Sequence, residues 1–180
     1  MRTLKTELQK IGIIFLFGFF IYIGLEVIWR TATNWGGTVP PRGLLAMGIL
    51  GGIVTVLLGY INEIKPLRKL PFWVHCIIGA VIVTSLEWLT GLLLNVHLGW
   101  NVWDYKHLIL STPDGQINLF FSLIWLILSP VAFYIDDEIR RRIALEDNIG
   151  LVISIKAQGN KREADRIWKR LRKSRKGYRF

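Results

Sequence analysis

Four long apolar runs constrain this 180-residue chain more than any other feature. They are 19 to 23 residues long, and the charged residues within them are Glu26 and Glu87. A helix rises about 1.5 Å per residue, so each run is long enough to cross a hydrocarbon core of about 30 Å. Because a helix satisfies its own backbone hydrogen bonds in lipid, the sequence predicts an all-α integral membrane protein. The predicted spans are residues 11–29, 43–61, 72–94 and 117–135.

The composition excludes several other classes of protein. Charged residues make up 20% of the chain, below the roughly 25% of soluble domains. This low fraction argues against an ordinary soluble globular protein. The single cysteine, Cys76, lies in the third apolar run, which argues against a secreted disulfide scaffold. The sequence has no Walker-type glycine loop, dinucleotide-binding glycine motif or nucleophile elbow. His75 and Cys76 would point about 100° apart on a helix, so we expect neither a metal site nor a cofactor.

Basic residues orient the predicted bundle. If both termini are cytoplasmic, 20 Lys and Arg residues lie inside and 3 lie outside. Cytoplasmic loops carry such an excess, so the sequence predicts a multi-pass protein of the inner or plasma membrane with both termini inside. Residues 1–135 would form the transmembrane domain and residues 136–180 a basic cytoplasmic tail.

The tail contains a predicted amphipathic helix over residues 160–176. Asn160 can cap it with Glu163 at the third helical position, and the apolar residues form one stripe: Ala164, Ile167, Trp168 and Leu171. Such a helix can lie on an anionic leaflet, whereas nucleic-acid binding is disfavoured because the membrane is already within reach. A cytoplasmic partner, or a tail that only fixes topology, remains an alternative. The expected lipid contacts are Lys161, Arg162, Arg166, Lys169, Arg170, Arg172 and Lys173.

A glycine pair in the second run predicts a packing face. Gly48 and Gly52 are four residues apart, a spacing that lets two helix backbones approach closely in lipid. The partner could be another helix of this chain, a second copy in a homo-oligomer or a partner membrane subunit.

The two acids in the apolar runs are candidate functional residues. A carboxylate at mid-membrane costs about 2.5–3.5 kcal/mol on insertion scales, and less near the interface. Glu87 lies in the outer half of the third run, and a functional role is favoured for it. Glu26 lies near the outer end of the first run, where a structural role is favoured.

Residues 86–125 resemble a known family. They read Glu87-Trp88-Leu89-Thr90-Gly91, then Trp103-Asp104-Tyr105, then Gly115-Gln116-Ile117-Asn118-Leu119 with Ser122 and Trp125. This arrangement is similar to the CmpB-type family, labelled putative ABC-transporter type IV. The resemblance implies a small multi-pass membrane protein with a permease label. Lys106 stands where the family tends to have Ser.

The same residues predict an outward-facing polar pocket under an aromatic lid. Helix four would start at the outer face, so its free N–H groups would point toward the nearby carboxylates. The alternative is structural: Asp104 ties down the loop while Trp103 and Tyr105 pack on the bundle. The pocket candidates are Glu26, Glu87, Trp88, Thr90, Trp103, Asp104, Tyr105, Gln116 and Asn118.

Three functions fit these expectations. The first is a transport-associated or accessory membrane subunit that uses the outward pocket. The second is a membrane-embedded enzyme on a lipid-linked or amphipathic substrate, with Glu87 or Asp104 as general acid or base and His97 as a proton carrier. The third is a scaffold whose aromatic loop and basic tail bind partner proteins.

Overall fold

The computed structural model describes residues 4–33, 40–61, 64 and 66–177. Its long helices are α1 (Leu4–Thr33), α2 (Pro41–Ile61), α3 (Phe72–Gly91), α4 (Leu119–Ala157) and α5 (Lys161–Gly177). A 3₁₀ turn, η1 (Leu67–Lys69), precedes α3, and a π-helix, η2 (Leu92–His97), follows it. The chain divides into two compact units, Met1–Asp137 and Glu138–Phe180.

The first unit is all-helical and suited to a membrane, as predicted. Within the described residues, four helical stretches are long and apolar enough to cross a bilayer: Glu7–Ala32, Pro41–Ile61, Phe72–His97 and Leu119–Ile143. Their outward faces expose large apolar side chains, including Phe20 at 66% and Ile127 at 72%. Water would oppose that much apolar exposure, whereas lipid would solvate it.

Glycines let α1 and α2 pack closely. A Cβ built on Gly48 would lie 2.6 Å from Phe19 Cε2, and one built on Gly52 would lie 2.6 Å from Phe15 Cε2. Across the same contact, a Cβ on Gly18 would lie 2.7 Å from the backbone oxygen of Gly51. The two predicted glycines therefore face α1 of the same chain.

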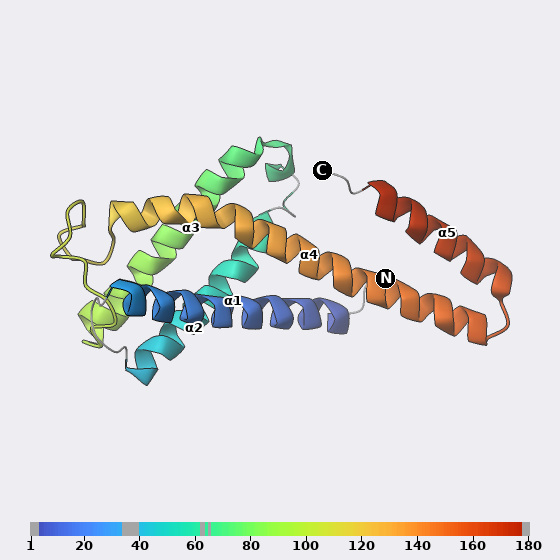
Figure 1. Ribbon diagram of the computed structural model, residues 1–180, viewed down its shortest axis with the longest axis horizontal. Coiled ribbons are helices and arrows are strands. Elements are labelled where there is room, and N and C mark those ends of the chain that lie inside the picture. Colours follow the sequence, from blue (N-terminus) through green and yellow to red (C-terminus); the bar gives the residue numbers. More distant parts are fainter. Residues whose placement is uncertain (1–3, 34–39, 62–63, 65, 178–180) are drawn as a thin grey trace. The chain divides into compact units, whose positions relative to one another are not determined.

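The apolar core joins α2, α3 and α4. Its buried members are Leu50, Val54, Leu58, Ile61, Cys76, Val83 and Phe133. The end of α1, the π-helix after α3 and the start of α4 lie at one end of the first unit, beside the loop of residues 98–118 (Figure 1). This end carries the candidate site.

Two helix boundaries differ from the sequence prediction. The third span changes to π-helical geometry at Leu92, and the fourth helix continues to Ala157 instead of ending near residue 135. The extension is stabilised within its own turn, because Glu138 forms ion pairs with Arg141 at 2.6 Å and Arg142 at 2.6 Å.

In the second unit, the predicted cap of α5 is present. Asn160 Oδ1 accepts a 3.3 Å hydrogen bond from the Glu163 backbone N–H, and Asn160 Nδ2 donates to Glu163 Oε2 at 2.6 Å. Ala164 is fully buried and Ile167 is half-buried. Five of the side chains predicted to contact anionic lipid are described and exposed: Lys161, Arg162, Arg166, Lys169 and Arg170.

Candidate functional site: an aromatic cavity around Glu87

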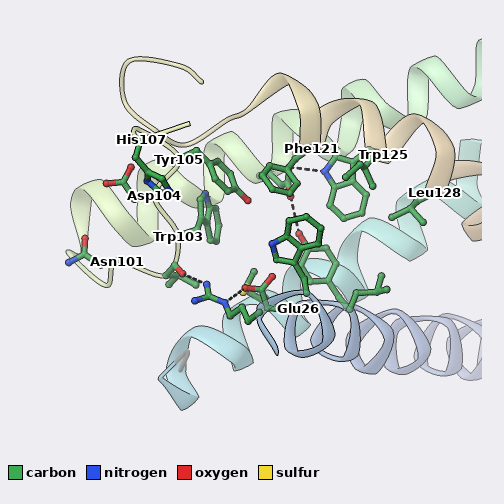
Figure 2. Close-up of a pocket in the computed structure, with 17 residues that line it drawn as sticks. Glu26, Asn101, Trp103, Asp104, Tyr105, His107, Phe121, Trp125 and Leu128 are labelled. Atoms are coloured by element: carbon green, nitrogen blue, oxygen red, sulfur yellow. Dashed lines mark hydrogen bonds and ion pairs between the residues drawn. The ribbon is translucent and has the colours of Figure 1, made fainter. Parts of the chain in front are cut away.

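A cavity of about 370 Å³ lies between α1, α4 and the loop of residues 98–118. Figure 2 shows Trp103 and Tyr105 from the loop, and Phe121 and Trp125 from α4, around the same space. Besides these four, the lining residues are Tyr22, Leu25, Glu26, Trp29, Arg30, Met47, Glu87, Asn101, Val102, Asp104, His107, Ile124 and Leu128. Six of the seventeen lining residues are Phe, Tyr or Trp, and acidic side chains lie among them.

Glu87 lines this cavity and joins three helices. Its side chain is buried, at 9% exposure. Tyr22 of α1 donates its hydroxyl to Glu87 Oε1 at 3.0 Å, and Trp125 of α4 donates Nε1–H to Glu87 Oε2 at 2.8 Å. The Tyr22 and Trp125 rings also stack, with centroids 5.6 Å apart. Both carboxyl oxygens thus have hydrogen bonds from neutral donors, as a buried acid requires.

Glu26 and Arg30 form an ion pair on one wall of the cavity. They lie one turn apart in α1, and both side chains are 17% exposed. Arg30 also donates from Nη2 to the Val102 carbonyl at 3.0 Å. The guanidinium therefore neutralises Glu26 and holds the end of α1 against the loop.

Asn95 in the π-helix organises the first half of the loop. Asn95 Nδ2 donates to the Trp103 carbonyl at 2.9 Å and to Gln116 Oε1 at 2.8 Å. Asn95 Oδ1 accepts from the Val102 backbone N–H at 2.7 Å, and Trp103 Nε1 donates to the Gln116 carbonyl at 3.1 Å. The π turn brings this amide into the loop, in agreement with the frequent association of such turns with sites.

A second set of bonds fixes the segment before α4. Asn118 Nδ2 donates to the Ile109 carbonyl and to Ser111 Oγ, each at 2.9 Å. Asn118 Oδ1 accepts from the Phe120 backbone N–H at 2.9 Å, so Asn118 caps the start of α4. The loop is consequently an ordered lid.

Asp114 ties this lid to α3. Its Oδ2 accepts a 3.0 Å hydrogen bond from Trp88 Nε1, and its Oδ1 accepts from the Thr112 hydroxyl and from the Gln116 backbone N–H. These donors stabilise the ionised form. The Thr112 hydroxyl has the largest effect, and the pKa of Asp114 is lowered below its usual value.

Tyr105 places its ring inside the lid. It stacks on Phe121 with centroids 5.0 Å apart. Burial raises the pKa of the Tyr105 hydroxyl well above its usual value, with smaller contributions from the charges of Glu87 and Glu26. The side chain therefore stays neutral at physiological pH.

The cavity brings together five of the predicted pocket residues: Glu26, Glu87, Trp103, Asp104 and Tyr105. Asp104 is exposed, and its Oδ1 accepts from the Lys106 backbone N–H at 2.9 Å. Its carboxylate and the side chain of Asn101 lie on the outer side of the loop, away from Phe121 and Trp125 (Figure 2).

The remaining predicted residues lie elsewhere. Trp88, Gln116 and Asn118 hold the lid, and Thr90 is half-buried in α3. The side chain of His97 is exposed at the end of the π-helix and does not line the described cavity. No group of three His, Cys, Asp or Glu side chains in the described ranges is placed to hold a metal ion.

Sequence reasoning missed Tyr22, Arg30 and His107 as cavity residues, and it cited Trp125 only as part of the family motif. One signal was available for the first two: Tyr22 and Arg30 lie four residues before and after Glu26. That spacing places all three on one helix face. His107 is separated from every helix by loop residues, so spacing alone could not have placed it.

Comparison with known proteins gives one relationship. A family model described as putative ABC-transporter type IV matches residues 13–155. The match includes the second, third and fourth candidate spans, all but the first six residues of the first, and α4 except its last two residues. No curated protein matches the chain. No solved structure matches it either.

Proposed function

Because this chain belongs to the putative ABC-transporter type IV family, we propose that it is a transport-associated membrane subunit whose cavity around Glu87 binds a ligand. The observation that carries the proposal is the cavity itself: a buried acid from α3 borders a ligand-sized space between α1 and α4. Ligand pockets of about 300–1,000 Å³ with a few placed polar groups are typical of binding sites. An acid within a membrane span is also a functional candidate, because an ionisable group is costly to place there.

The cavity opens on the outer side of the membrane in this proposal. The excess of Lys and Arg in the N-terminus, the residues 62–71 loop and the tail favours cytoplasmic termini. The loop of residues 98–118, which covers the cavity, would then face outward.

The subunit would work with an ATP-hydrolysing partner. These 180 residues contain no Walker-type glycine loop, and the proposal assigns the nucleotide-driven step to a partner. His97, the proton carrier expected for an enzyme, is exposed outside the cavity, and the proposal is therefore a binding role. A scaffold without a ligand would have no need of a cavity bordered by a buried acid.

Purification of the tagged chain from its native membranes tests this proposal. We expect the native assembly to show vanadate-sensitive ATP hydrolysis, and the same chain purified from a heterologous host to show none. The Glu163→Gln variant, altered far along the sequence from the cavity, should recover the same activity. A native assembly with no more ATP hydrolysis than an untagged control would contradict the proposal.

We further infer that α5 lies on the anionic cytoplasmic leaflet. Its exposed basic side chains surround the stripe of Ala164, Ile167 and Trp168, and each basic residue near such a surface contributes roughly 1 kcal/mol. Trp168 fluorescence, taken as the difference between the spectra of wild type and Trp168→Phe, should shift to the blue when nanodiscs of neutral lipid are replaced by anionic ones. An unchanged spectrum would refute this contact.

A further inference from the structure

We propose that the ligand of the Glu87 cavity is a small organic cation, whose ammonium or quaternary ammonium group sits among the aromatic rings beside Glu87. The inference rests on the proposed function, because it names the ligand class of the same pocket. Three features of the cavity carry it: its charge, its aromatic surface and its size.

The lining contains more acidic than basic side chains. The carboxyl groups of Glu26 and Glu87 border the cavity, whereas the Asp104 carboxylate lies on the outer side of the loop; Arg30 carries the single guanidinium among the described lining residues. Arg30 is committed to Glu26 and to the Val102 carbonyl. Among the described residues, the hydrogen bonds given to Glu87 come from the neutral groups of Tyr22 and Trp125. A cationic ligand would supply the positive charge that Glu87 does not receive from the described residues.

The aromatic surface suits the same ligand class. Tyr22, Trp103, Tyr105, Phe121 and Trp125 all border the space, and they come from α1, the lid and α4 (Figure 2). The face of an aromatic ring is negative and attracts a cation within about 6 Å of its centre. Rings on several sides of a cavity are the means by which proteins recognise quaternary ammonium groups.

The size of the cavity limits the ligand. A volume of about 370 Å³ lies near the lower end of the range for small-molecule sites. An anion would meet the acidic groups of Glu26 and Glu87, and a neutral apolar ligand would make no charge contact with Glu87. A compact cation with an apolar surface meets neither difficulty.

Choline and its neutral carbon isostere, 3,3-dimethyl-1-butanol, provide a matched pair of probes. They have nearly the same shape and differ in the charge of one atom. Binding is measured by calorimetry on the full chain in lipid nanodiscs, with tetramethylammonium as a minimal cation. We expect both cations to bind, and choline to bind at least tenfold more tightly than its isostere.

Two variants locate the binding. Glu87→Gln should weaken choline binding at least tenfold, whereas Glu163→Gln, the same substitution on α5, should leave it unchanged. Because loss of the Glu87 charge could impair folding, Phe121→Leu offers a second test. It removes a ring but remains apolar, and it should weaken choline binding several-fold with little effect on the isostere.

Each contrary result has a separate meaning. Equal binding of choline and its isostere would overturn the cation inference and leave the pocket as a binding site. Failure of both cations to bind would also overturn it, whereas the ATP hydrolysis of the native assembly tests the proposed function independently. Choline binding that neither Glu87→Gln nor Phe121→Leu weakens would place the site elsewhere and overturn the inference.

Discussion

Trp125 Nε1 donates a 2.8 Å hydrogen bond to Glu87 Oε2, joining α4 to α3 in the buried part of the first unit. Tyr22 completes the junction from α1 through the other carboxyl oxygen. The same carboxylate therefore borders the cavity and holds its walls together. A ligand that changes the position or charge balance of Glu87 would act on three helices at once.

Trp125→Phe should destabilise the bundle measurably. The substitution keeps an aromatic ring but leaves Glu87 Oε2 without its donor, and an unsatisfied buried charged group costs about 1–3 kcal/mol or more. We expect a lower thermal midpoint in detergent. Trp88→Phe is the matched control, because Trp88 is 44% exposed and its lost partner, Asp114, lies near the surface. Equal losses in the two variants would contradict a special role for the Glu87 junction.

Asn95→Ala should loosen the lid without unfolding the helices. Asn95 makes three hydrogen bonds, one each to Val102, Trp103 and Gln116. Each partner group that stays buried without its hydrogen bond would cost about 1–3 kcal/mol of stability. Hydrogen exchange in peptides covering residues 98–118 should accelerate, while α2 and α3 stay protected. His97→Ala alters an exposed side chain two residues away, and it should change the hydrogen exchange of the lid little. An equally fast lid in both variants would argue that Asn95 does not hold it.

Gly18→Ala should weaken the contact of α1 with α2. The new methyl group would lie 2.7 Å from the Gly51 carbonyl oxygen, and overpacking of this kind costs about 1–3 kcal/mol. Gly24→Ala is an internal control in the same helix, since a Cβ there has nothing within 4 Å. Helix propensity favours alanine at both positions. The thermal midpoint should therefore rise in Gly24→Ala and fall in Gly18→Ala, where the clash outweighs the propensity. A midpoint that rises in both variants would disprove the close approach.

Acid should release the tie between the lid and α3. The pKa of Asp114 is lowered in the folded protein, chiefly by the Thr112 hydroxyl. Its ionised form therefore adds stability above its unfolded pKa of about 4, and this contribution disappears as pH falls through the lower folded pKa. The thermal midpoint of wild type should approach that of Asp114→Asn as pH falls from 7 to 3. A constant difference over this range would rule out the linkage.

Cysteine labelling should establish the orientation of the spans. In a Cys76→Ala background, cysteine at Asn101 should react with a membrane-impermeant maleimide in intact cells. Cysteine at Lys69 or Asn160 should react only after the membrane is permeabilised, because all three positions are exposed in the structure but lie on opposite sides in the proposed orientation. The reverse pattern would invert the topology and place the cavity on the cytoplasmic side.

The sequence alone determined the helical membrane architecture, the family resemblance and the candidacy of Glu87. These follow from local properties: apolar run length sets the spans, and an acid within a span is conspicuous. The Asn160–Glu163 cap could be predicted for the same reason, because its partners are three residues apart.

Only the tertiary structure decided how the acids are used. The Glu87 partners, Tyr22 and Trp125, lie 65 and 38 positions away, and no periodicity within one helix specifies which side chains of another helix it will meet. Asn95 became the centre of the lid because a π turn redirects its amide, which helical spacing does not indicate. Glu26 and Glu87 resembled each other in sequence, but folding gave one a guanidinium and the other two neutral donors. The Glu26–Arg30 pair is local to α1, whereas packing between helices brings both donors to Glu87; in the proposed function this makes Glu87 the acid that meets a ligand.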